Sequence, residues 1–209
     1  MTPRRVNPEA TRARRPVAHR PGDVTAIERL RLTDRVRPGV RVLFVGINPG
    51  VRSALTNHHF AGHSNRFWKV LFEAGLVPEP ITFEDDDRLH EWGFGVTNLI
   101  PRPTPGIDTL TADDYAAGLV RLRRKVRRWK PAVVAFVGVT LYRYIFGIRS
   151  STRVTAGLQR ELFEGARVFA LPNPSGRNAN FSSAQMVEAF ASLEQVLASS
   201  APPDDTPDA

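Results

Sequence analysis

The sequence predicts an α/β protein with three layers, in which helices cover both faces of a mainly parallel central sheet of about four strands. Short continuous apolar runs, typical of strands buried on both faces, recur along the chain. Segments with apolar residues three or four positions apart, typical of amphipathic helices, lie between them. This alternation requires crossover connections and therefore favours parallel strands.

The first strand is predicted at residues 42–45, where an apolar run precedes Gly46. A short helix is expected before it, at about residues 24–32. A long loop should follow as far as Ser64, which has a side chain suited to an N-cap. The next helix is predicted over residues 65–74, with its apolar stripe toward the core and Gly75 after its end.

An acidic segment, residues 82–92, is predicted to form a surface helix. Its adjacent carboxylates, Asp85 to Asp87, are interpreted as a solvated helix start that the helix dipole favours, in preference to a cation site. A short strand over residues 94–99 should carry Asn98 at its end. The prolines that follow predict a rigid, irregular loop.

Thr111 and Asp114 form a variant capping box, which predicts a helix from there to Trp129. The Arg-rich second half of this helix is interpreted as a solvated face, with a DNA-facing surface as the alternative. The remaining predicted elements are a strand at residues 132–138, a helix at 140–146, a polar connection at 147–165, a strand at 166–171 and a last helix at 184–197, capped by Ser182 or Ser183.

The composition indicates one basic globular domain. The 209 residues are 42% hydrophobic, include no cysteine and carry a formal net charge of +8. Disulfides and thiolate-bound metals are therefore excluded, and an anionic partner such as nucleic acid is favoured, although charge alone fits a solubility role equally well. The expected organisation is a disordered basic arm at residues 1–22, one domain at 23–199 and a flexible tail at 200–209.

Several other classes of protein are not expected. No segment has the length and hydrophobicity of a membrane span or of a secretory signal, so we expect a cytoplasmic protein, nucleoid-associated if bacterial. Three His residues lie within residues 57–63, but no Asp, Glu or Cys is near them, and no metal site or cofactor is expected. A nucleotide-binding α/β enzyme ranks last because no glycine-rich phosphate loop follows a strand.

Two predicted strands end in loops of small and polar residues. One loop is Asn48-Pro49-Gly50, and the other is residues 172–178. Because the carboxyl ends of parallel strands meet at one edge of a sheet, we expect the two loops to share a cleft. Asn48 offers an acceptor and a donor, which suits a water molecule or the edge of a base. Taken alone, the first loop is better interpreted as a strand-ending turn without a function, because short motifs match by accident.

These loops, and a helix start between them, resemble the mismatch-specific uracil and thymine DNA glycosylases, the Mug and thymine-DNA glycosylase branch of the uracil-DNA glycosylase superfamily. The similar blocks are Gly46-Ile47-Asn48-Pro49-Gly50, Asn65-Arg66-Phe67-Trp68-Lys69 and Asn173-Pro174-Ser175-Gly176. The resemblance extends from about Arg41 to about Leu197. The resemblance implies the fold of that superfamily. It also implies an activity that needs no metal or cofactor, the hydrolysis of the bond between a flipped base and deoxyribose.

The resemblance also implies roles at the reacting bond. Asn48 would hold the attacking water where faster superfamily members have Asp. Because an amide cannot accept a proton as a carboxylate does, catalysis would depend on positioning and on charge stabilisation. Backbone N–H groups around Ile47 and in the second loop would receive the departing base anion.

Four further residues are implied in base recognition. Phe60 matches the aromatic residue that stacks on the flipped base, with a core position as the alternative. His59 matches a His that contacts the substrate. Asn98 would pair with the base edge, and Ser53 would border the pocket near C5 of the base.

DNA contacts are implied for the second loop. Arg177 matches the residue that fills the gap left by the flipped base, with a plain phosphate contact as the alternative. Ser175 and Gly176 would contact flanking phosphates. The full set implied in DNA binding is Lys69, Asn173, Ser175, Gly176, Arg177 and Asn178.

The implied function is that of a monofunctional DNA repair glycosylase, acting as a monomer on double-stranded DNA. Its substrate would be uracil opposite guanine, with thymine and etheno-cytosine as further candidates, because a mispaired base is flipped at lower cost. The alternative is a DNA lesion-binding protein without catalysis. The chain departs from the family pattern at His63-Ser64 and at Arg52, so the resemblance does not predict the shape of the pocket rim.

Overall fold

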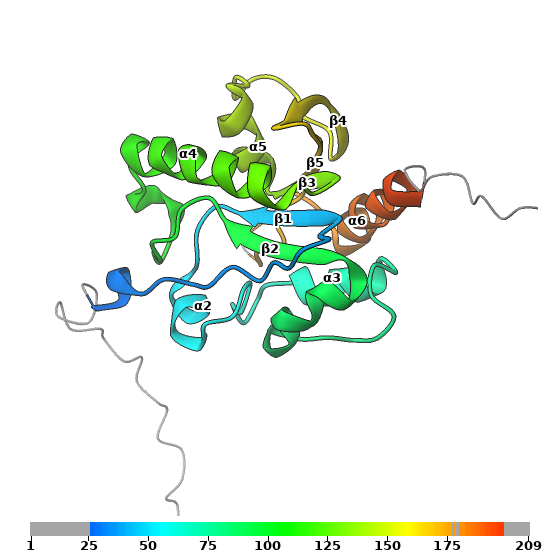
Figure 1. Ribbon diagram of the computed structural model, residues 1–209, viewed down its shortest axis with the longest axis horizontal. Coiled ribbons are helices and arrows are strands. Elements are labelled where there is room, and N and C mark those ends of the chain that lie inside the picture. Colours follow the sequence, from blue (N-terminus) through cyan, green and yellow to red (C-terminus); the bar gives the residue numbers. More distant parts are fainter. Residues whose placement is uncertain (1–25, 177, 179, 199–209) are drawn as a thin grey trace, which may run out of the picture.

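The computed structural model describes residues 26–176, 178 and 180–198. The predicted basic arm, Arg177 and the predicted tail lie outside these residues. Within them, five strands form one sheet in the order β2-β1-β3-β5-β4 (Figure 1). They are β1 (Val42–Gly46), β2 (Phe94–Asn98), β3 (Val133–Val137), β4 (Gly157–Phe163) and β5 (Ala166–Leu171). Neighbouring strands are parallel except β4, which pairs antiparallel with β5, and the predicted fold class is confirmed.

Helices cover both faces of this sheet (Figure 1). They are α2 (Val51–Thr56), α3 (Phe67–Glu73), α4 (Ala112–Trp129), α5 (Val139–Phe146) and α6 (Ser183–Ala198), with the 3-10 helices η1 (Phe83–Trp92) and η2 (Ile107–Thr109). One buried cluster joins the sheet to α3, η1 and α6, and a second joins it to α4 and α5. The three predicted layers follow from these two clusters. No helix in the described ranges combines the length and hydrophobicity needed to cross a bilayer.

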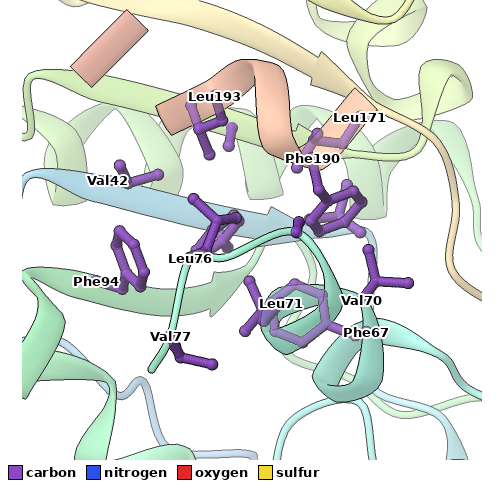
Figure 2. Packing of buried hydrophobic residues seen from close by; sticks show 14 of the residues in the cluster. Val42, Phe67, Val70, Leu71, Leu76, Val77, Phe94, Leu171, Phe190 and Leu193 are labelled. Carbon is purple, nitrogen blue, oxygen red and sulfur yellow. The ribbon is translucent and has the colours of Figure 1, made fainter. Parts of the chain in front are cut away.

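The central strand β1 explains why two cores form. All its residues are buried, and successive side chains point to opposite faces of the sheet. Val42 and Phe44 therefore join the cluster of α3 and α6, whereas Leu43 and Val45 join that of α4 and α5. Figure 2 shows the first cluster, to which β1 contributes Val42, α3 contributes Phe67 and Leu71, and α6 contributes Phe190 and Leu193.

Several local predictions are confirmed. Thr111 caps α4 through the capping box with Asp114, whose backbone N donates to the Thr111 hydroxyl at 3.2 Å. The Ser182 hydroxyl accepts from the backbone N of Gln185 at 3.2 Å, at the start of α6. Gly75 follows α3 with φ of +74°, which favours glycine. These caps fix where the long helices begin and end.

Other boundaries were wrong. The loop predicted to reach Ser64 contains α2, which has no side-chain cap to signal it. The helix predicted from residue 65 begins at Phe67, where Asn65 rather than Ser64 accepts a backbone N–H, at 3.0 Å. The polar connection at residues 147–165 contains the edge strand β4, in which half-buried and exposed residues alternate. An edge strand needs no continuous apolar run, so the connection gave no strand pattern.

The prediction of a solvated acidic helix start was wrong at Asp86. Asp86 is fully buried, although Asp87 is exposed. The segment is a 3-10 helix, in which successive residues point about 120° apart. Three adjacent carboxylates on such a helix cannot all face solvent, and Asp86 is the one that faces inward.

Candidate active site

The carboxyl ends of β1 and β2 lie side by side. Gly46 pairs in register with Asn98, and the pairing continues beyond the strands because the backbone N of Ile100 donates to the Ile47 carbonyl at 2.8 Å. A Cβ atom at Gly46 would lie 2.6 Å from Asn98 Oδ1 and 3.5 Å from Phe60 Cζ. Only glycine, which has no Cβ atom, lets Asn98 and Phe60 come this close to the backbone. Gly46 thus places both side chains next to the chain, two residues before Asn48.

The amide of Asn48 has a fixed orientation. Its Nδ2 donates to the Thr104 hydroxyl at 2.7 Å, and the carbonyl oxygens of Pro49 and Arg102 lie at 3.2 and 3.3 Å. Because three acceptors surround this atom, it must be the nitrogen of the amide. Among the described residues, nothing donates to Asn48 Oδ1. That oxygen is therefore the acceptor that a water molecule can use.

Thr104, which the sequence interpretation did not select, determines this orientation. It is 2% exposed, and its hydroxyl donates to the Gly106 carbonyl at 2.5 Å. With its proton committed to Gly106, the hydroxyl can act only as an acceptor toward Asn48. The spacing of Thr104 between two prolines marks a rigid loop but gives no sign of its partner, which is 56 positions away.

Arg102 supports the same loop from outside. Its guanidinium donates to Asp114 at 2.6 Å and to Glu28 at 3.3 Å. The ion pair with Arg102, followed by the hydrogen bond from the Thr111 backbone, lowers the pKa of Asp114 to about 2. Asp114 thus connects the cap of α4 to the loop whose carbonyl faces Asn48.

Phe60 lies in a constrained loop. Its φ of +51° is in the left-handed region, which bulky residues rarely adopt. Its ring stacks on Phe67 with centroids 4.1 Å apart, and it is half-buried. Both the predicted base-stacking role and the alternative core role are compatible with this position, because one face of the ring packs on the core.

His59 is placed differently from the expected substrate contact. It is 1% exposed, its Nε2 lies 3.0 Å from the Thr33 carbonyl, and Asn98 Nδ2 lies 3.4 Å from its Nδ1. Burial lowers the pKa of His59 to about 4, so the ring is neutral at pH 7 and Nδ1 can accept from Asn98. His59 therefore contacts a predicted base-reading residue rather than open space.

Ser53 is likewise buried, at 5% exposure. Its hydroxyl accepts from the backbone N of Ala61 at 3.0 Å. The hydroxyl predicted to border the base thus anchors the residue after Phe60.

The second loop packs against the start of α3. The backbone N of Arg66 donates to the Pro174 carbonyl at 2.9 Å, and a Cβ at Gly176 would lie 2.5 Å from Ser64 Cβ. Within the loop, Asn173 Oδ1 accepts from the Ser175 backbone N at 3.0 Å. Asn178 Nδ2 donates to the Asn173 carbonyl at 2.8 Å. The loop is thus a folded turn that presents the exposed Asn173 and Gly176.

Lys69 is on α3, but its side chain points away from the face of α3 that packs on the core. The side chain is 70% exposed, and its Nζ lies 3.5 Å from Glu73 Oε1.

A cavity of about 420 Å³ lies next to Phe60. It is lined by aromatic and basic side chains that include Phe60, Trp68, Phe72, Phe83, Arg52 and Lys69. Its lining includes neither Asn48 nor Asn98 nor a residue of the second loop, so this cavity is not the cleft expected between the two loops.

No group of three His, Asp or Glu side chains in the described part of the chain is arranged to hold a metal ion. The arrangement brings the amide of Asn98 and the ring of Phe60 next to Gly46, two residues before the oriented amide of Asn48. The sequence model of the uracil DNA glycosylase superfamily matches residues 33–194 of the chain. The match covers every residue that the sequence predicts for the site.

Proposed function

The chain belongs to the uracil DNA glycosylase superfamily, whose members are hydrolases that act on DNA, and from this membership we propose a more specific activity. The protein hydrolyses the N-glycosidic bond of uracil mispaired with guanine in double-stranded DNA, as a monomer in the cytoplasm. Thymine and etheno-cytosine are further candidate substrates. The oriented amide of Asn48 carries the proposal.

Asn48 positions the attacking water. Its nitrogen is held by Thr104 and by two carbonyl oxygens, so its Oδ1 is left to accept from water and to direct it at the anomeric carbon. The amide cannot take the proton of that water. The reaction is therefore driven by placement of the water and by stabilisation of the departing base anion, for which we assign the backbone N–H groups around Ile47.

Asn98 and Phe60 bind the flipped base. One N–H of Asn98 faces His59, which leaves its second N–H and its Oδ1 for the O4 and N3–H of uracil. The Phe60 ring, stacked on Phe67 through one face, offers the other to the base. Stacking accepts any pyrimidine, so the choice of base rests on Asn98.

The loop of residues 173–178 contacts the DNA around the extruded nucleotide. Its turn is attached to the start of α3, which fixes its position relative to the base site. Backbone N–H groups of such a turn and the Lys69 ammonium suit phosphates, and we assign Arg177 to the gap left in the duplex. A mispaired base is extruded at lower cost, which supports the preference for G·U over A·U.

The test is a set of matched oligonucleotides containing G·U, G·T, A·U and single-stranded uracil, incubated with the protein and EDTA. Excision leaves an abasic site, which alkali converts to a strand break. The proposal predicts breaks at G·U in preference to A·U. If all four substrates remain intact while the protein binds the G·U duplex, the lesion-binding alternative is correct.

A further inference from the structure

Asp86 is a buried carboxylate that the proposed reaction does not use. It is fully buried on η1, and three groups from other segments meet its two oxygens. Arg35 Nε and His58 Nδ1 lie 2.9 and 3.0 Å from Oδ1, and the His59 backbone N donates to Oδ2 at 2.8 Å. A buried charge is tolerated when it is paired and hydrogen-bonded in this way, so the position of Asp86 is strongly specified.

The cation that pairs with Asp86 is itself anchored to the sheet. Arg35 forms an isolated antiparallel bridge with Val96 of β2, through backbone hydrogen bonds of 3.0 and 2.8 Å. Its guanidinium also donates to the Asn57 carbonyl at 2.7 Å. Arg35 and Asp86 together therefore fix residues 57–59 relative to the edge of the sheet that carries Asn98.

His59 transmits this constraint to both base-binding residues. Its side chain is held between the Thr33 carbonyl and Asn98 Nδ2, and its carbonyl accepts from Trp68 Nε1 at 3.1 Å. The next residue is Phe60, whose backbone is in the left-handed region. A strained conformation persists only where its neighbours over-determine it, and here His59 is held on one side and Ala61, through Ser53, on the other.

We infer that Asp86 is a positioning residue for base recognition: by holding His59, it fixes the ring of Phe60 and the amide of Asn98 in the arrangement that receives the flipped base. The inference rests on the proposed function. It differs from a general stabilising role because it requires Asp86 to act on excision through Asn98 and Phe60. It also gives His59 a role without direct contact with the substrate.

The test compares Asp86→Asn with Asp87→Asn, a matched control on the exposed side of the same helix. The amide in Asp86→Asn keeps the shape but replaces one acceptor by a donor, so at least one of the three partners is lost. Single-turnover excision from a G·U duplex is measured well below each melting temperature. We expect Asp86→Asn to be slower by about 10- to 100-fold, with unchanged binding to undamaged duplex, and Asp87→Asn to match wild type.

A double-mutant cycle separates positioning from stability. If Asp86 acts through Asn98, Asp86→Asn should slow an Asn98→Ala variant by much less than it slows wild type, because the two changes remove the same interaction. Arg35→Lys, which keeps the positive charge beside Asp86, provides a second variant if Asp86→Asn does not fold. It should be slowed in the same direction, by a smaller factor.

Wild-type excision rates in the folded variants, or slowing of Asn98→Ala by the same factor as wild type, would overturn the inference. Inactivity of the wild-type protein on the same duplex would instead refute the proposed function, and the inference with it.

Discussion

Replacing Thr104 by valine removes one hydroxyl and almost no volume from the site. The hydroxyl accepts from Asn48 Nδ2 at 2.7 Å, the shortest of the three contacts of that nitrogen, and donates to the Gly106 carbonyl. A neutral hydrogen bond contributes about 0.5–1.5 kcal/mol, and an unsatisfied buried partner costs about 1–3 kcal/mol. We therefore expect Thr104→Val to lower the free energy of unfolding by about 1–3 kcal/mol.

The same change should slow excision. The two remaining acceptors, the carbonyl oxygens of Pro49 and Arg102, lie at 3.2 and 3.3 Å and hold the amide less firmly. If the lost orientation raises the activation barrier by about 1–2 kcal/mol, the single-turnover rate falls about 5- to 30-fold. The assay is excision from a G·U duplex at saturating enzyme, below the melting temperature of the variant.

Thr109→Val is the matched control. The Thr109 hydroxyl also donates to the Gly106 carbonyl, at 3.4 Å, but it is exposed and does not reach Asn48. Its loss should leave the rate unchanged. A folded Thr104→Val protein that excises uracil as fast as Thr109→Val would refute the argument that the hydroxyl orients the amide.

Two further predictions concern stability. The pKa of His59 is lowered to about 4 by burial, against the raising effects of the Thr33 carbonyl, Asp86 and Asp34. As pH falls, His59 therefore takes up a proton in the unfolded chain before it does so in the folded protein. The free energy of unfolding should fall by up to about 3 kcal/mol as pH drops from about 6.5 to about 4. Urea unfolding at several pH values should show a weaker dependence for His59→Gln, and equal slopes would contradict the assignment. In Gly118→Ala, the new Cβ would lie 2.8 Å from the Leu99 carbonyl oxygen, so we expect a loss of about 1–3 kcal/mol, partly offset by helix propensity. An unchanged urea midpoint would contradict this.

The sequence was most informative where burial is complete. The strands β1, β3 and β5 lie inside the sheet, and their continuous apolar runs predicted them. The edge strand β4 was missed because it has no continuous apolar run: the polar Gln159 and Glu161 lie on its half-buried face, whereas Leu158 and Leu162 are exposed. The short helix α2 was missed because Gly50 supplies no side-chain cap.

The positions of two candidate site residues could be expected for a similar reason. Asn48 and Asn98 follow apolar strands, so their positions at one sheet edge could be expected from the strand order. The groups that orient them could not be expected in this way. Thr104 and Asp86 act on residues 56 and 27 positions away, and no local pattern connects such pairs. The sequence places His59 next to Phe60, which suggested a contact with the substrate. The structure shows instead that His59 is buried and that its Nδ1 faces Asn98.

The most direct measurement compares wild type with Asn48→Ala on the same G·U duplex, scoring alkali-labile sites formed in a single turnover and the affinity for the duplex. If Asn48 Oδ1 directs the water, the variant should bind the duplex as tightly as wild type and excise uracil at least about 100-fold more slowly. Equal excision by the two proteins would contradict the assignment of the attacking water to Asn48.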